Sequence, residues 1–479
     1  MKINTTRRKF LGASSLVPLT CLSGPVTAAK QSPRKPNILF IMADDLGYAD
    51  LSCYGRRDYQ TPRIDRLAED GLRFTSAYAN SAVCSATRTA LMTGNYQYRY
   101  SVGLEEPLAF GNIGLEPSLP TLSSLLQEHG YSTMLIGKWH LGRLPDYGPL
   151  QSGYDHFWGF RNGGIDYFSH SAGGNHDLWD GDTSVYQTGY LTDLLGDRAV
   201  STLQQLGQSS RPFLMSLHFS APHWPWEGLD SEEESARLSA SSNPLTLAHF
   251  DGGSMAIYAE MVERLDYQVG RVLDELVRQG LDENTIVIFT SDNGGERFSD
   301  TYPFTGRKTE LLEGGLRIPA IVKWPGKAAP KTTSDTPVMT MDWLPTFLSA
   351  AGIEAPDGVS FDGTDIGPVI AQDGSIADRT LFWRYKNLDQ RAVRDGNWKY
   401  LRIAGNEFLF DIAADPMERA NLKDRRPEIF ARLKAEYEAW DADMLPFNPN
   451  SFTHGFNGSE LADHFGLPAE DTLIPPATE

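Results

Sequence analysis

Two continuous apolar runs constrain the fold of this chain more than any other feature of its sequence. Residues 37–42 read Asn-Ile-Leu-Phe-Ile-Met, and residues 285–290 read Thr-Ile-Val-Ile-Phe-Thr. Such runs are typical of parallel strands that are buried on both faces. Further strand and helix patterns alternate with them, including strands at 132–136 and 212–219 and a helix at 255–279. The alternation predicts an α/β fold with a large, mainly parallel sheet and helices on both faces.

Polar residues follow both runs closely. Asp44 and Asp45 come after the first run, and Asp292 and Asn293 come after the second. Ligands of open α/β sheets bind at the carboxyl ends of the strands, where adjacent acids repel each other unless a cation lies between them. Three carboxylates and an amide oxygen suit calcium or magnesium better than zinc. The pattern predicts a metal site; the alternative is that the acids cap helices in two unrelated loops.

A cysteine opens the segment Cys84–Gly94, which reads as a short helix that ends at its glycine. The N-terminus of a helix favours an anionic nucleophile or an oxyanion. Arg88 lies one helical turn further on and can reach back toward residue 84. These residues indicate an activated thiol or an anion site. The alternative is a disulfide between Cys84 and Cys53, since Cys21 would leave with a leader peptide.

Several motifs, in order along the chain, resemble those of the type I sulfatases, which belong to the alkaline phosphatase superfamily. The most specific is Cys-x-Ala-x-Arg followed by Leu-x-Thr-Gly at residues 84–94, where Ala86 replaces the commoner proline. The resemblance runs from about Pro36 to Met444. Its other motifs are Ala43–Tyr48, Gly137–Gly142, Ser291–Gly295, and Lys308 with Glu313–Pro319.

The resemblance implies the chemistry of the site. A maturation enzyme would oxidise Cys84 to formylglycine; the hydrated aldehyde attacks the sulfur of the ester and later expels sulfate by C–O cleavage. A divalent metal, expected to be calcium with magnesium as the alternative, would act as a Lewis acid. The implied metal ligands are Asp44, Asp45, residue 84 itself, Asp292 and Asn293.

Five further residues match positions that have roles in the family. Arg88 resembles the arginine that holds the formylglycine hydrate. Lys138 and Lys308 resemble the lysines that neutralise the sulfate oxygens. His140 resembles the histidine that hydrogen-bonds the hydrate, and His223 resembles the histidine near the leaving oxygen, where it would bind substrate and act as a general acid.

The substrate side of the site is expected in two loop segments. Residues 158–168, with Arg161 as the main candidate, and residues 170–180 combine aromatic, amide and charged groups that suit a sugar ring. Ordinary loop packing is the alternative interpretation. The sequence does not choose between them.

The acidic balance of the chain bears on its partners. Its formal net charge is −19, and residues 1–28 contain four basic and no acidic residues, so removal of that segment would leave −23. Such a surface argues against nucleic acid as a partner, because phosphate binding needs a basic patch. It would also repel an anionic ester at long range. Any sulfate site must therefore be a local cluster of Lys, Arg and His.

The N-terminus predicts export. Thr6–Leu11 matches the twin-arginine signature, a short apolar run follows, and Val26–Ala28 offers small residues for cleavage, so residues 1–28 read as a signal peptide rather than a frayed basic end. No apolar run of membrane-spanning length follows residue 28, and Pro18–Cys21 is a poor acylation signal. We expect a periplasmic or secreted product without a stable membrane span or a lipid anchor.

The texture of the sequence changes near residue 355. Residues 36–355 carry the sulfatase-like motifs and form the predicted catalytic domain. Residues 356–444 show short strand patterns, glycine turns and an amphipathic helix, which predict a small subdomain with an antiparallel sheet. Residues 445–479 are rich in Pro, Asn and acids and predict an irregular tail.

The predicted function is the hydrolysis of sulfate esters on a sulfated carbohydrate or polysaccharide fragment. Export favours an environmental or host polysaccharide over a steroid or lipid sulfate. A phosphomonoesterase or phosphonate hydrolase of the same superfamily is the nearest alternative; it would usually use Ser or Thr, or a second metal with more Asp and His ligands. A glycan-binding relative without catalysis would have lost metal or nucleophile positions, which are intact in this chain.

Overall fold

The computed structural model describes residues 1–2, 5–6, 9, 34–104, 112–241, 243–447, 455 and 461–462. The chain divides into two units, Met1–Arg34 and Lys35–Glu479, and the helices and strands of the described residues lie in the second. Most of the predicted signal peptide and most of the predicted tail lie outside the described residues. Within the described ranges, no helix is both long and apolar enough to cross a bilayer.

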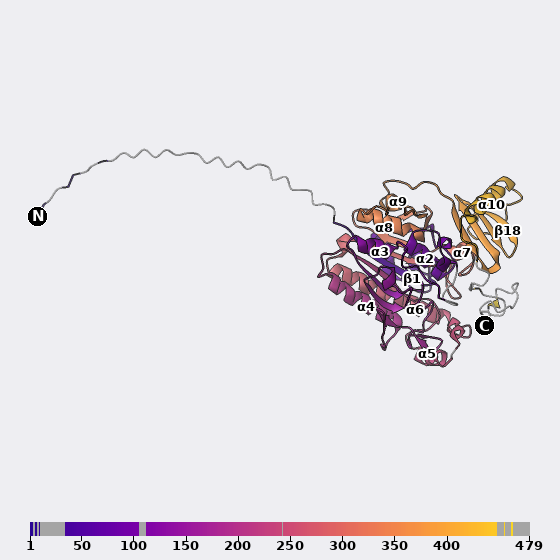
Figure 1. Ribbon diagram of the computed structural model, residues 1–479, viewed down its shortest axis with the longest axis horizontal. Coiled ribbons are helices and arrows are strands. Elements are labelled where there is room, and N and C mark those ends of the chain that lie inside the picture. Colours follow the sequence, from indigo (N-terminus) through magenta and orange to yellow (C-terminus); the bar gives the residue numbers. More distant parts are fainter. Residues whose placement is uncertain are drawn as a thin grey trace. The chain divides into compact units, whose positions relative to one another are not determined.

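A mostly parallel sheet forms the centre of the second unit (Figure 1). Its middle strands run parallel to one another, in the order β11 (Thr285–Ser291), β1 (Asn37–Ala43), β10 (Phe213–His218), β4 (Ser132–Lys138) and β5 (His156–Phe160). Both apolar runs are therefore confirmed as buried, adjacent parallel strands.

Shorter strands extend this sheet on both sides. In the described part of the chain the sheet has ten strands. Strand β12 pairs antiparallel with β11 and therefore runs against its neighbour. The added strands are β2 (Leu72–Phe74), β8 (Trp179–Asp180), β9 (Thr183–Ser184), β12 (Ala320–Lys323) and β13 (Thr332–Ser334). Two small sheets are separate from this one: β3 (Ala77–Tyr78) pairs with β14 (Val338–Met339), and β6 (Ser171–Ala172) pairs with β7 (Asn175–His176).

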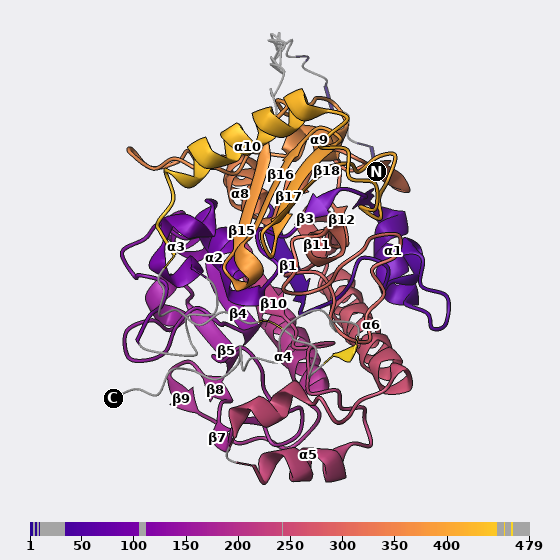
Figure 2. The same cartoon turned by 90° about the vertical axis from the view of Figure 1, so that its right-hand side faces the viewer.

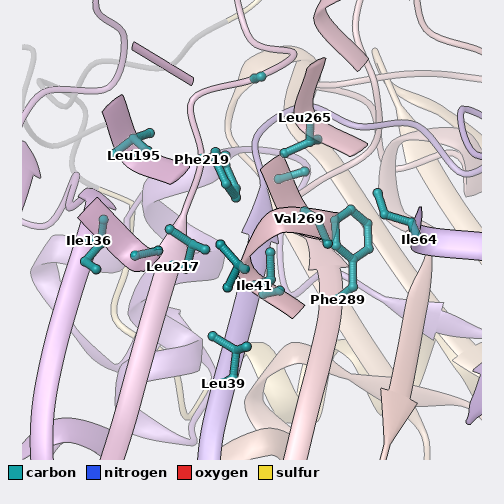
Figure 3. Packing of buried hydrophobic residues seen from close by; sticks show 14 of the residues in the cluster. Leu39, Ile41, Ile64, Ile136, Leu195, Leu217, Phe219, Leu265, Val269 and Phe289 are labelled. Atoms are coloured by element: carbon teal, nitrogen blue, oxygen red, sulfur yellow. The ribbon is translucent and has the colours of Figure 1, made fainter. Parts of the chain in front are cut away.

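Helices cover both faces of the sheet because alternate residues of each strand point to opposite faces. Leu39 and Ile41 join one hydrophobic core and Ile38 and Phe40 join the other. Figure 3 shows Ile41, Leu217 and Phe289, from three neighbouring strands, on the face packed by Leu265 and Val269. This face is covered by helices α1 (Pro62–Asp70), α4 (Leu191–Leu206) and α6 (Met255–Arg278). The other face is covered by α3 (Leu122–Glu128), α8 (Trp343–Ala351) and α9 (Gly367–Ala371). Two further helices, α5 (Glu232–Ser239) and the short α7 (Glu313–Leu316), lie in connecting segments.

The predicted C-terminal sheet is also present. Strands β15 (Leu381–Tyr385), β16 (Gln390–Asp395), β17 (Trp398–Ile403) and β18 (Asn406–Asp411) form an antiparallel meander. Helix α10 (Pro427–Asp441) lies across it (Figure 2) and packs on one face through Leu433 and Tyr437. The other face packs against helix α2.

Helix α2 (Cys84–Thr93) is enclosed on both sides. Leu91 and Met92 belong to the core of the main sheet, whereas Ala86 and Ala90 pack with the C-terminal sheet. All ten residues of this helix are buried. The helix ends at Gly94, whose φ of 67° is the left-handed conformation that glycine adopts at little cost. The two sheets thus fix the position of Cys84, the first residue of the helix.

Candidate active site

The acids that follow the two central strands lie next to each other. Ala43 pairs with Ser291, so Asp44 and Asp292 leave β1 and β11 at the same level. The backbone N–H of Asp45 donates to Oδ1 of Asp292 (3.2 Å), and Nδ2 of Asn293 donates to Oδ1 of Asp45 (2.7 Å). All four side chains are buried. The parallel register therefore brings together the four residues that the sequence placed in two distant loops.

Cys84 faces this group of acids. One ligand atom each of Asp44, Asp45, Cys84 and His223 lies within 4.8 Å of all the others. Cys84 is the first residue of α2, where the helix dipole favours negative charge. No disulfide joins it to Cys53, and burial raises the pKa of the Cys53 thiol well above its usual range. The disulfide alternative is therefore wrong.

Arg88 is buried beneath Cys84, on the same helix. Its Nη2 and Nε donate to Oδ2 of Asp292, at 2.9 and 3.1 Å, and its Nη2 lies 3.9 Å from Oδ2 of Asp44. Burial raises the pKa of Asp44 well above its usual range, and the charge of Asp292 adds to that rise. For Asp292 the cations outweigh burial, chiefly Arg88, and its pKa is lowered.

Two buried lysines complete the charge distribution. Nζ of Lys138 lies 2.5 Å from Oδ2 of Asp44, and Nζ of Lys308 lies 2.7 Å from Oδ2 of Asp45. Burial opposes the charged form of each lysine, but the nearby acids outweigh it and raise the pKa of both ammonium groups. The site therefore holds three fixed cations within an acidic protein.

The glycine before Lys138 determines the direction of the Lys138 side chain. Gly137 has a φ of 109°, and a Cβ atom there would lie 1.8 Å from the carbonyl oxygen of His218 on the neighbouring strand. Only glycine fits a position with both constraints. The backbone can therefore turn at the end of β4 and direct Lys138 toward Asp44.

The two predicted histidines are buried nearby. Nδ1 of His223 lies 2.7 Å from the carbonyl oxygen of Trp224, which can only accept, so Nδ1 carries the proton. Nε2 then faces Oδ2 of Asp45 at 3.6 Å. Burial lowers the pKa of His223 well below its usual range, and Lys308 and Lys138 lower it further. His140 adopts a φ of 57°, and its backbone N–H donates to the carbonyl of Arg161.

The side chain of Arg161 is held by the loop that follows β5. Its Nη2 donates to the carbonyl of Gly181 (2.9 Å) and to Oδ1 of Asp182 (3.0 Å), and its guanidinium lies 4.1 Å from the ring centroid of Trp179. Burial lowers its pKa. These contacts are those of loop packing, and a role in sugar binding stays a prediction.

Comparison with known proteins identifies the family. A family model described as Sulfatase matches residues 36–353. The chain belongs to the sulfatase family, whose members are sulfuric ester hydrolases. A second family model, described as N-sulphoglucosamine sulphohydrolase, C-terminal, matches residues 307–442.

Named relatives of this sulfatase differ in substrate. It is 31% identical over 399 residues to N-acetylgalactosamine-6-sulfatase of Rattus norvegicus, covering 80% of this chain and 74% of the relative. It is 30% identical over 542 residues to steryl-sulfatase of Mus musculus, covering 91% and 86%. Its structure resembles that of Ps i-CgsB in complex with k-i-k-neocarrahexaose, with a TM-score of 0.78 and 29% identity over 91% of this chain and 99% of the other.

Sequence reasoning missed one residue of this sulfatase's site. His218 ends β10, and its Nδ1 lies 3.2 Å from both Nη1 of Arg88 and the carbonyl oxygen of Lys138. Burial, assisted by the charge of Arg88, lowers its pKa to about 3, so the ring is neutral. Nδ1 accepts from Arg88 in one tautomer and donates to the carbonyl of Lys138 in the other. The available signal was a histidine at the end of a mostly apolar strand.

Proposed function

We propose that this sulfatase removes sulfate from a carbohydrate, with residue 84 as a formylglycine and a calcium ion as cofactors. The observation that carries the proposal is the position of Cys84, which lies at the start of a buried helix with its sulfur close to two carboxylates. The hydrate of formylglycine would supply the attacking hydroxyl. A maturation enzyme that converts Cys84 is therefore a required partner.

The residues fit a calcium ion. Oδ1 of Asp44 and Oδ1 of Asn293 are buried and have no hydrogen-bond partner among the residues that the structure describes. Buried acceptors without partners cost free energy, and a cation between them would remove that cost. Oxygen donors alone favour calcium or magnesium. Asp44, Asp45, residue 84, Asp292 and Asn293 would hold the ion, which when bound would polarise the sulfate ester.

The cations of the site suit a sulfate group. Lys138 and Lys308 present ammonium groups that the acids keep charged. Arg88 would hold the nucleophile at residue 84 while Asp292 and His218 fix its guanidinium. This local positive charge would attract the sulfate group at short range, although the net charge of −19 is expected to repel it at long range.

His140 and His223 would take part in hydrogen bonding and proton transfer. We assign to His140 the hydrogen bond to the hydrate of residue 84, and to His223 a place beside the leaving oxygen. In the resting site Nε2 of His223 has no proton, because Nδ1 donates to the carbonyl of Trp224. A general-acid role therefore requires that His223 first accepts a proton at Nε2.

A sulfated carbohydrate is the proposed substrate class. N-acetylgalactosamine-6-sulfatase and the complex with k-i-k-neocarrahexaose support a sugar, whereas steryl-sulfatase is a relative at similar identity that does not. The predicted export by the twin-arginine route, to the periplasm or the medium, adds support because large glycans lie outside the cell. Arg161 remains a candidate for sugar contact.

The test begins with peptide mass spectrometry to establish that residue 84 is converted. Sulfate release is then measured on a panel of sulfated oligosaccharides, with a steryl sulfate and matching sugar phosphates included. Release from a sugar sulfate supports the proposal. Release from the steryl sulfate alone would contradict the substrate class, and turnover of phosphates alone by fully converted protein would favour the phosphoesterase alternative.

A further inference from the structure

The C-terminal sheet contributes a side chain to the loop that carries Lys308. We infer that Gln390, the first residue of β16, is a positioning residue that fixes the direction of the Lys308 ammonium group. The inference rests on the proposed role of Lys308 in binding the sulfate. It assigns part of the anion site to a sheet that begins 73 residues further along the chain.

Thr309 is the point at which this loop is strained. Its φ is 72°, in the left-handed region that a β-branched residue rarely adopts. Such a conformation persists only when its surroundings hold it in place. Because Thr309 follows Lys308 directly, its backbone conformation determines where the Lys308 side chain leaves the chain.

Gln390 holds the backbone on the C-terminal side of this strained residue. Its Nε2 donates to the carbonyl of Thr309 (2.8 Å), and its Oε1 accepts from the N–H of Leu311 (2.8 Å). The side chain is 1% exposed. An amide is the side-chain group that can donate to one peptide and accept from another at once. Gln390 therefore fixes two peptide groups of the loop.

Backbone contacts hold the other side of the strained residue. The N–H of Thr309 donates to the carbonyl of Ala82 (2.9 Å), two residues before Cys84, and the N–H of Lys308 donates to the carbonyl of Gly295 (2.9 Å), two residues after Asn293. The loop is thus tied to the nucleophile segment and the metal-ligand segment. Gln390 adds a contact from the C-terminal sheet, and a small shift there would move Nζ of Lys308 away from Asp45.

Loss of Gln390 should leave the protein folded. Further along the same loop, Glu313 is bound independently by Lys399, at 3.0 Å, and its backbone N–H donates to Glu418 at 2.6 Å. The loop therefore stays attached to the C-terminal sheet. An effect on the anion site can then be separated from an effect on folding.

The experiment uses Gln390→Met, which keeps the length of the side chain and removes its hydrogen bonds to Thr309, Leu311 and Asn387. It also uses Gln390→Glu, which keeps only the acceptor for Leu311. The probe is inorganic sulfate, whose inhibition constant and calorimetric dissociation constant are measured with converted full-length enzyme. We expect Gln390→Met to weaken sulfate binding about tenfold and to raise KM more than it lowers kcat. Asn421→Leu is the matched control, because Asn421 also bridges a backbone N–H and a carbonyl, on β18.

A double-mutant cycle with Lys308→Ala tests whether Gln390 acts on sulfate binding through Lys308. If Gln390 acts through Lys308, Gln390→Met has no further effect on sulfate binding in the Lys308→Ala background. An equal effect in both backgrounds, or sulfate binding that Gln390→Met leaves unchanged, would overturn the inference alone. If Lys308→Ala itself leaves sulfate binding unchanged, the proposed role of Lys308 fails and the inference fails with it.

Discussion

Two buried clusters of charged residues lie on opposite ends of the same loop, and they differ in how completely they are paired. The first gathers at the strand ends and is named the catalytic cluster because its residues form the proposed active site. The second, the anchor cluster, joins the loop to the C-terminal sheet. The catalytic cluster consists of Asp44, Asp45, Arg88, Lys138, Asp292, Asn293 and Lys308, and the anchor cluster of Tyr78, Glu313, Arg317, Arg394, Lys399 and Glu418.

In the anchor cluster every carboxylate oxygen has a hydrogen-bond or ion-pair partner. Oε1 of Glu313 receives Lys399, and its Oε2 receives Tyr78 and Arg317 at 2.6 Å each. Oε1 of Glu418 forms an ion pair with Lys399 (2.8 Å), although it makes no hydrogen bond in the described part of the chain, and its Oε2 accepts from the backbone N–H of Glu313. In the catalytic cluster, Asp44 and Asn293 each keep an oxygen without a hydrogen-bond partner in the described part of the chain. We interpret the cluster whose carboxylate oxygens all have a hydrogen-bond or ion-pair partner as one that stabilises the fold, and we propose that the less completely paired cluster binds a ligand.

Among the substitutions that test this comparison, Cys84→Ala is expected to have the largest effect on activity. It removes the nucleophile, so turnover should fall at least about 10³-fold, while the free energy of unfolding changes by less than about 1 kcal/mol because alanine favours the helix. Sulfate release and urea denaturation measure the two quantities. Cys53→Ala is the matched control and should keep full activity; comparable activity in Cys84→Ala would refute the formylglycine mechanism.

Lys399→Met tests the anchor cluster. It leaves Glu313 and Glu418 buried side by side without their shared cation, which should cost about 3–5 kcal/mol in the free energy of unfolding. Urea denaturation is the measurement. Lys138→Met, assayed with calcium present, should cost less, because a bound metal still compensates Asp44. A larger loss of unfolding free energy in Lys138→Met than in Lys399→Met would show that the catalytic cluster contributes more to the stability of the fold.

Calcium should stabilise the protein through the catalytic cluster alone. At 100 times the dissociation constant, a ligand that binds only the folded state adds about 2.7 kcal/mol. Thermal unfolding in EGTA and in calcium measures this shift. Asp292→Ala should abolish the shift and the activity together, whereas Glu418→Gln should retain it. Retained activity after chelation would argue against the metal site.

A third cluster, in which Glu227 and Asp166 meet without an ion-pair partner among the residues that the structure describes, predicts an effect confined to the pH dependence of stability. Burial, followed by the charge of Asp166, raises the pKa of Glu227 from 4.5 to about 10, and Glu234 adds to the rise. Its Oε2 accepts from the N–H of Tyr167 (2.9 Å). The folded protein keeps this proton when the unfolded chain has lost it. The contribution to stability is therefore complete below about pH 4.5 and is lost progressively as pH rises toward 10.

Glu227→Gln keeps the shape and the acceptor for Tyr167 without the titration. The loss of unfolding free energy between pH 5 and pH 8 should shrink by on the order of 4 kcal/mol, because each pH unit of this window contributes about 1.4 kcal/mol. Chemical denaturation at both pH values measures it. Glu232→Gln, on the exposed first turn of α5, is the control and should leave the pH dependence unchanged. An identical pH dependence in Glu227→Gln would show that Glu227 is ionised in the folded protein.

The sequence by itself determined the elements and the chemistry-bearing residues. The apolar runs predicted β1 and β11, because strands buried on both faces need continuous apolar residues. The residues after them predicted a metal site, since strand ends converge at one edge of a parallel sheet. Short strand patterns predicted β15 to β18.

Only the tertiary structure decided how these residues meet. His218 contacts Arg88 from a strand 130 residues away in sequence, and Gln390 reaches the Lys308 loop from the other sheet. The left-handed conformation of Thr309 has no local signal, because threonine does not favour it. Pairing between distant segments depends on strand order and on the packing of two sheets around α2. Local sequence carries no record of either.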